Sequence, residues 1–210
     1  MKTTIYLIRH SKQLKISLPK EDSQIANEKI ILSILGEEKA KQLSIFLKKH
    51  YNIDYLYSSN YVRAISTAKY ISDIFNIDIN IDSNFGERKL GDLNSLEKLA
   101  IGKKNSYTID QILNENFKNI GSESMLDVRK RALLSLNKIL KNHSGKNICI
   151  VTHGALIKFL LLNYCNLNKE NMTIEFNGKK IVGMKLDSPD IIKLEFNNLD
   201  IETIEHIPCL

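Results

Sequence analysis

Two short apolar runs, Thr4–Ile8 and Ile148–Thr152, are each followed within two residues by a histidine. Apolar runs of this length, without alternation, are typical of strands buried on both faces of a parallel sheet. Segments with helical periodicity lie between the two runs. Strands that alternate with helices predict a mostly parallel sheet covered by helices on both faces. The expected fold class is therefore α/β, a three-layer sandwich.

The spacing of apolar residues assigns most other elements. Further strands are predicted at 55–57 and 78–81. Apolar residues that recur every three or four positions predict helices at 36–49, 59–75, 124–140 and 155–162. Ser59 is expected to cap the second of these helices, and Ser122 or Ser124 the third.

Three segments are less regular. Alternation at 180–186 and 191–196, on either side of a turn at 187–190, predicts a hairpin. The polar stretch 12–29 is expected to be a loop. A short helix is expected at about 109–117.

Length and charge limit the possible partners. A chain of 210 residues fits one domain, here 1–210. The net charge is +6, but the lysines are scattered and form no basic stripe interleaved with aromatic residues, so no nucleic-acid partner is expected. The longest apolar stretch, Ala155–Leu162, is far shorter than a bilayer requires, so no membrane partner is expected either.

The cysteines and the first residues bear on the compartment. Cys149, Cys165 and Cys209 show no CxxC spacing, which indicates neither a disulfide framework nor a zinc site and fits a reducing compartment. The first apolar run stops at Arg9, which is too early for the core of a signal peptide. A cytoplasmic location is expected. The sequence leaves the oligomeric state open.

The candidate site follows from the strand ends. Ligands of such sheets bind beyond the carboxyl ends of the strands, where His10 and His153 fall. A lone histidine there is more often structural than catalytic. Arg9 and Arg63 favour a phosphate site, because arginine holds phosphate oxygens in a bidentate manner and Arg63 lies in the first turn of a predicted helix. The other histidines are expected at the surface: His50, His143 and His206.

Four segments then carry a resemblance to a known family: YLIRHS (Tyr6–Ser11), SSNYVRAISTA (Ser58–Ala68), FGERKLGDLNS (Phe85–Ser95) and VTHGALIKFLL (Val151–Leu161). In this order they resemble the phosphatase branch of the histidine phosphatase superfamily, also called phosphoglycerate mutase-like. Two weaker stretches, Leu32–Leu47 and Gly121–Leu136, agree, so the resemblance covers most of the chain up to about Leu162. It implies a phosphoglycerate mutase-like fold and a phosphoric monoester hydrolase that uses neither a cofactor nor a metal.

The resemblance also implies a role for each site residue. His10 would be the nucleophile that forms a phosphohistidine. Arg9, Arg63 and His153 would hold the phosphoryl oxygens, and Glu87 would be the general acid and base. Phosphoryl transfer needs mainly positioning and stabilisation of spread-out negative charge, which such a set can supply. The implied substrate is a phosphorylated small molecule.

The residues that follow the two histidines are also expected near the phosphate. Gly154 would let the backbone approach the phosphate closely. Ser11 stands where the family usually has glycine, so its backbone must avoid positive φ, and its hydroxyl would be free to contact phosphate. An asparagine with which the family contacts phosphate has no counterpart in the run Lys12–Ile16.

Three alternatives follow from the same residues. A phosphoglycerate mutase would use the same site, but such mutases resemble longer chains with a larger insertion. A non-catalytic phospho-ligand-binding relative would account for Ser11 and the missing asparagine, yet would not need both a nucleophile and an acid. A metal site built from His10, His153 and Glu87 is disfavoured because the nearby arginines would repel a cation.

Overall fold

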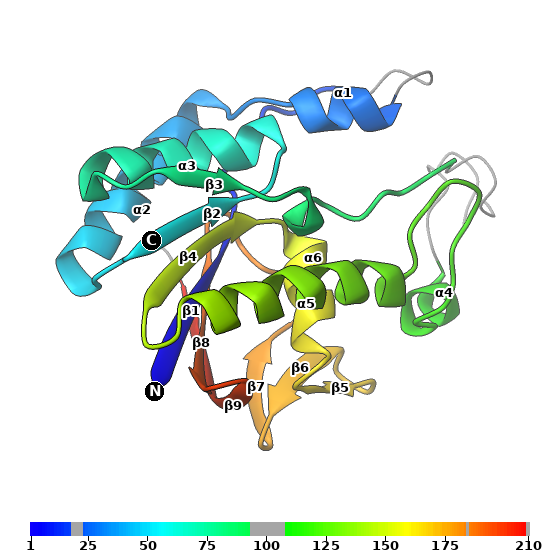
Figure 1. The fold of residues 1–210 in the computed structure, drawn as a ribbon. Coiled ribbons are helices and arrows are strands. Elements are labelled where there is room, and N and C mark those ends of the chain that lie inside the picture. Colours follow the sequence, from blue (N-terminus) through cyan, green and yellow to red (C-terminus); the bar gives the residue numbers. More distant parts are fainter. Residues whose placement is uncertain (18–22, 93–107, 184, 209–210) are drawn as a thin grey trace.

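The structure, a computed structural model, describes residues 1–17, 23–92, 108–183 and 185–208. Within these residues the largest sheet has six strands, in the order β3 (Ile79–Ile81), β2 (Tyr55–Ser58), β4 (Asn147–Thr152), β1 (Lys2–Arg9), β8 (Ile191–Asn197) and β9 (Asp200–Ile207). The first four strands are parallel, whereas β8 and β9 run antiparallel to their neighbours (Figure 1). The prediction of a mostly parallel sheet is confirmed.

Helices cover both faces of this sheet. One face carries α2 (Ile34–His50) and α3 (Val62–Phe75), and the other carries α5 (Met125–Asn142) and α6 (Gly154–Leu161) (Figure 1). The α/β three-layer class is confirmed, and it matches the four helices that the apolar spacing predicted.

Strand β1 shows why its sequence is an unbroken apolar run. Ile5 and Leu7 pack in the core cluster under α5 and α6, whereas Tyr6 and Ile8 pack in the separate cluster under α2 and α3. Alternate side chains of a strand point to opposite faces, so a strand with helices on both sides must be apolar at every position.

Of the two helix starts expected at serines, one is confirmed. Ser33, at which no cap was expected, caps α2 by accepting a hydrogen bond from the Gly36 amide at 3.1 Å. Ser124, rather than Ser122, caps α5 in a capping box with Asp127. The expected cap at Ser59 is wrong, because α3 begins at Val62 after an N-cap residue without a side-chain bond.

The predicted hairpin of 180–186 with 191–196 is wrong. Strand β7 (Lys179–Val182) pairs with β6 (Thr173–Phe176), which also pairs with β5 (Asn166–Asn168) in a separate antiparallel sheet. Strand β8 instead lies between β1 and β9. Its Ile191, Ile192 and Leu194 are fully buried, so an interior position in the main sheet removes them from water.

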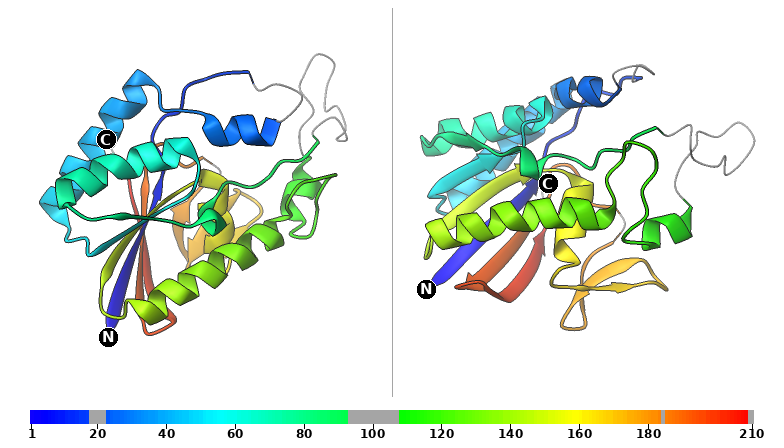
Figure 2. Two further views of the ribbon diagram at one scale, coloured as in Figure 1. Left: turned by 45° about the horizontal axis from the view of Figure 1, so that its top comes forward. Right: turned by 45° about the vertical axis from the view of Figure 1, so that its right-hand side comes forward.

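Two shorter elements also differ from expectation. Residues 23–29, expected within a loop, form α1 (Ser23–Lys29), and α4 (Ile109–Leu113) is shorter than the expected 109–117. No residue of α1 is buried, so it has no apolar face for a sequence pattern to show. It lies beside the start of α3, where the Gln24 amide donates to the Tyr61 hydroxyl at 2.6 Å (Figure 2).

Across the described ranges, no helix combines the length and the apolar character needed to cross a bilayer.

Candidate active site

The carboxyl ends of β1, β4 and β2 bring the candidate residues together. These strands are neighbours, and each continues into the site: His10 follows β1, His153 follows β4 and Ser59 follows β2. The His10 amide donates to the Thr152 carbonyl at 2.8 Å, which keeps the two chain segments in register beyond the sheet. The rings of His10 and His153 lie 5.1 Å apart, centroid to centroid. The expectation that both histidines share one edge of the sheet agrees with this geometry.

The hydrogen bonds of His10 fix its tautomer. Its Nδ1 lies 2.7 Å from the Ser11 carbonyl oxygen, which can only accept, so Nδ1 carries the proton. Nε2 then holds a lone pair, and it accepts a hydrogen bond from Arg63 Nε at 3.1 Å. Burial, with the charge of Arg63 adding to it, lowers the pKa of His10 to about 3. The ring is therefore neutral at physiological pH, with its lone pair directed at the guanidinium.

Arg63 joins three parts of the site. It is the second residue of α3, which confirms its predicted place in the first turn of a helix, and it is buried. Besides the bond to His10, its Nη2 lies 3.4 Å from His153 Nδ1 and its Nη1 donates to the Asn27 carbonyl of α1 at 2.7 Å. A cation thus spans both histidines, in a place where phosphoryl oxygens would be favoured.

His153 is fully buried and is the N-cap residue of α6, so it lies at the positive end of that helix. Its Nε2 is 2.8 Å from the Ser59 hydroxyl, the group that was expected to cap α3. Burial, followed by the charges around it, holds the pKa of His153 well below its usual value. Ser59 is fully buried, and its hydroxyl also accepts from the amide of Tyr61, the N-cap residue of α3, at 3.2 Å. The hydroxyl thus satisfies a buried histidine and the chain just before α3 together.

Arg9 lies at the end of β1 beside the first turn of α6. Its Nη1 donates to the Leu186 carbonyl, while its Nε is buried and has no hydrogen-bond partner in the described part of the chain. A buried unpaired donor on a cation is a ready contact for an anion. A Cβ at Gly154 would lie only 3.2 Å from that Nε, so the glycine makes room for Arg9. The predicted approach of phosphate to the Gly154 backbone stays a prediction.

Ser11 fits without strain, because its φ is not positive. Its side chain is fully buried, its hydroxyl donates to the Gly36 carbonyl at 2.6 Å and its amide donates to Thr67 Oγ1 at 2.9 Å. The hydroxyl therefore already has an acceptor in α2. Its predicted contact with phosphate stays a prediction.

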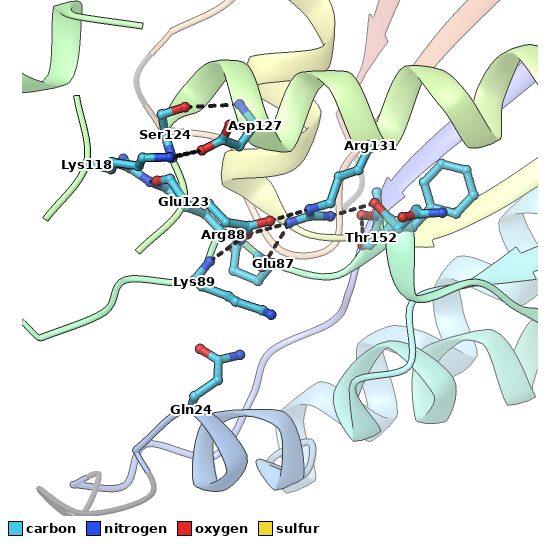
Figure 3. A network of polar contacts seen from close by, with 12 residues as sticks. Gln24, Glu87, Arg88, Lys89, Lys118, Glu123, Ser124, Asp127, Arg131 and Thr152 are labelled. Carbon is cyan, nitrogen blue, oxygen red and sulfur yellow. Dashed lines mark hydrogen bonds and ion pairs between the residues drawn. The ribbon is translucent and has the colours of Figure 1, made fainter. Parts of the chain in front are cut away.

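Glu87 lies on the loop that follows the short helix η1 (Ser83–Phe85) and is half-buried. Its Oε1 accepts from the Arg88 amide at 3.0 Å (Figure 3). Burial lowers the pKa of Arg63, and the negative charge of Glu87 opposes that shift. The carboxylate also lines a cavity of about 240 Å³, together with Tyr61 and Lys89 among others. The structure thus brings Glu87 to the same side of the molecule as the buried histidines.

A comparison with protein families decides the family. The model of the histidine phosphatase superfamily (branch 1) matches residues 5–188, which include every candidate site residue. The chain belongs to this superfamily. The match extends beyond Leu162, where the resemblance seen in the sequence ended.

One relative is similar in sequence, and two solved structures are similar in fold. Phosphoglycerate mutase-like protein 4 of Arabidopsis thaliana is 28% identical over 134 residues, which are 61% of this chain. The aligned part is 58% of that relative, so the chain spans little more than half of its length. A mycobacterial glucosyl-3-phosphoglycerate phosphatase has the same fold, with a TM-score of 0.71 at 17% identity, over 99% of this chain and 98% of that one. Phosphoglycerate mutase of Bacillus anthracis shares the fold as well, with a TM-score of 0.65 at 16% identity, over 98% and 92%.

Sequence reasoning missed some residues that shape the candidate site of this member of the superfamily. Lys158 lies one helical turn beyond Gly154 on α6, and its pKa is lowered by burial, an effect that the charge of Glu87 opposes. Its spacing of four from Gly154 was a usable signal, since such residues share one face of a helix. Asn27 acts through its backbone carbonyl, which no sequence pattern reveals.

The other histidines differ in exposure. His50 is exposed as expected, whereas two others are only half-exposed and have partners: His143 with the Tyr57 hydroxyl and His206 with Asp190.

The two buried histidines predict acid sensitivity. Unfolded histidine takes up a proton near pH 6.5, but folded His10 and His153 do so only at much lower pH. Below about pH 6.5 the unfolded state therefore binds more protons than the folded state. As the pH is lowered, we expect the free energy of unfolding to fall by up to about 1.4 kcal/mol per pH unit for each histidine. Urea unfolding between neutral pH and about pH 5 measures this slope, before most carboxylates titrate. The slope should be shallower in His10→Gln, and an equal slope in that variant would contradict the prediction.

Proposed function

We propose that this protein is a metal-independent phosphatase that hydrolyses a phosphomonoester through a phosphohistidine on His10. The observation that carries the proposal is the state of the His10 ring. Its Nδ1 proton is held by the Ser11 carbonyl, and its Nε2 lone pair meets Arg63 beside His153. A neutral imidazole with a directed lone pair, enclosed by cationic donors, suits attack on a phosphorus atom.

In the first step, Nε2 of His10 attacks the phosphorus, a nitrogen–phosphorus bond forms, and the bond from phosphorus to the ester oxygen breaks. The phosphoryl group takes the place that Arg63 Nε now holds at Nε2, and Arg63 turns its donors to the phosphoryl oxygens. Arg9 Nε, buried and unpaired within the described residues, supplies a further donor. The leaving alkoxide receives a proton from Glu87.

In the second step, Glu87 takes a proton from water, the water oxygen attacks the phosphorus, and the nitrogen–phosphorus bond breaks. Inorganic phosphate leaves, while His10 and Glu87 return to their starting states. His153, with Ser59 on its other nitrogen, would hold a phosphoryl oxygen through both steps. In both steps, side chains of this chain thus stabilise the negative charge on the phosphoryl oxygens.

The proposed substrate is a phosphorylated small molecule, and the proposed compartment is the cytoplasm. The free thiols of Cys149 and Cys165 support a reducing compartment, while Cys209 lies outside the described residues. The names of two proteins of the same fold suggest compounds to assay, namely glucosyl-3-phosphoglycerate and a phosphoglycerate.

The test is release of inorganic phosphate from p-nitrophenyl phosphate and from a panel of phosphomonoesters that includes these compounds, with a chelator present. We expect release that the chelator leaves unchanged. Isomerisation of a phosphoglycerate that depends on a bisphosphorylated primer, with little phosphate released, would instead identify a mutase. Binding of phosphate by folded protein without any turnover would identify a non-catalytic relative.

A further inference from the structure

The loop that carries Glu87 is held in place by an ion pair from another part of the chain. Residues 86–89 belong to neither a helix nor a strand, so their shape depends on bonds from outside. Arg131, on α5, and Glu123, just before α5, supply these bonds (Figure 3). Arg131 Nε lies 2.7 Å from Glu123 Oε1 and its Nη2 lies 3.0 Å from Oε2, so the pair is bidentate.

Arg131 donates hydrogen bonds to two backbone carbonyls, one in η1 and one in the loop. Its Nη1 donates to the Asn84 carbonyl at 2.5 Å, and its Nη2 donates to the Glu87 carbonyl at 3.2 Å. The guanidinium thus binds both η1 and the loop that follows it, while it also holds Glu123. Its planar fork makes these contacts at once, which a lysine could not do.

Glu123 binds the loop at Arg88 and Lys89. Its Oε2 accepts from the Lys89 amide at 3.0 Å, and its own backbone exchanges bonds with the same segment, accepting from Arg88 Nε at 2.8 Å and donating to the Lys89 carbonyl at 3.0 Å. Burial opposes the charge of Glu123, but the bonds from Arg131 and Lys89 outweigh it, so the pKa of Glu123 lies below its usual value. The pair is therefore ionised at neutral pH.

We infer that the Arg131–Glu123 pair is the positioning element that fixes the Glu87 carboxyl for proton transfer. The inference rests on the proposed function, in which Glu87 is the acid and base. Neither residue needs to touch substrate. Glu87 Oε1 accepts from the amide of the next residue, Arg88, so the direction of the carboxyl follows the backbone that the pair holds.

The kinetic consequence is specific. A displacement of about 1 Å costs an oriented catalytic group on the order of 100-fold in rate. That cost appears only where the proton is needed. The p-nitrophenolate ion leaves without protonation, whereas phenolate, a stronger base, gains more from a general acid. Misplacement of Glu87 therefore slows phenyl phosphate more than p-nitrophenyl phosphate, which is similar in size.

The experiment compares kcat/KM for these two esters in wild type, Arg131→Lys and Glu123→Gln, with Glu87→Gln as the reference for a lost acid. Arg129→Lys is the matched control. Arg129 also lies on α5 and forms a bidentate pair, with Glu115, and no bond from it to the Glu87 loop is recorded among the described residues. Urea unfolding of each variant monitors folding.

We expect Arg131→Lys and Glu123→Gln to lose about 10- to 100-fold on phenyl phosphate but less than about threefold on p-nitrophenyl phosphate, with Arg129→Lys close to wild type on both. Equal losses on the two esters, or no loss, would overturn the positioning role if Glu87→Gln itself discriminates between the esters. If wild type releases no phosphate, or if Glu87→Gln treats both esters alike, the proposed function fails instead. Should Arg131→Lys fold poorly, Glu123→Gln decides by the same comparison.

Discussion

Replacing His10 by alanine is expected to lower kcat/KM for phosphomonoesters by about 10⁴-fold or more, because the change removes the atom that would form the covalent intermediate. Arg63 cannot replace it, since a guanidinium carries no available lone pair. Two measurements check the result: the rate of phosphate release, and capture of a radiolabelled phosphoryl group on the protein during turnover. In wild type the label should survive alkali and be lost in acid, as a phosphohistidine would. It should be absent from His10→Ala.

The control is another histidine with a polar partner. His143, bonded to Tyr57, ends α5 near the amino ends of the strands, at the opposite edge of the sheet from His10. His143→Ala should retain both turnover and label. Activity of folded His10→Ala within about tenfold of wild type would exclude His10 as the nucleophile, since losing a nucleophile costs far more.

Changing Arg63 to lysine is expected to lower kcat/KM by about 10²- to 10³-fold, the usual cost of one lost donor to a developing oxyanion. The positive charge remains, but the fork that reaches His10, His153 and Asn27 at the same time does not. Inhibition by inorganic phosphate should weaken in the same variant, because the lost donors also bind the ground state.

Arg129→Lys again provides the comparison, since it makes the same change at an ion pair with Glu115. If Arg63→Lys kept wild-type kcat/KM, charge alone would suffice and the directed geometry around His10 Nε2 would not matter.

The sequence predicted the meeting of His10 and His153 because parallel strands end at one edge of a sheet. Strands β1 and β4 are adjacent and in register from Thr4 with Asn147 to Arg9 with Thr152. Apolar runs marked these strands, and the place of the histidines followed. The α/β class was predictable for a related reason, since a strand covered by helices on both faces is apolar at successive positions.

The pairing of the later strands was predicted wrongly from the sequence. Alternation marked parts of β7 and β8 but could not say which strand each would pair with. A stronger local signal lay in Asn177-Gly178, the turn between β6 and β7, where both residues have positive φ. Asn-Gly between alternating segments favours a two-residue hairpin turn, and it would have assigned β7 to β6.

Side chains with two possible uses limited the prediction of the site. Ser59 matched a helix cap, but its partner His153 is 94 residues away in the chain. In the sequence, Glu123 and Arg131 look like ordinary polar residues before and within α5. No local pattern shows that they bind the Glu87 loop. Contacts of this kind are set by the tertiary fold, so a pattern in one segment cannot reveal them.

The segment 186–190 has a consequence for synthesis. The Leu186 carbonyl accepts from Arg9, and Ser188 donates to the His10 carbonyl, across separations of 177 and 178 residues. A ribosome adds about 5–20 residues per second, so roughly 10–35 s pass between making His10 and making these partners. During that interval β1 also lacks its neighbour β8. A nascent chain therefore carries His10 long before it can hold that histidine in place, and the site is complete only after residues 186–190 have been made.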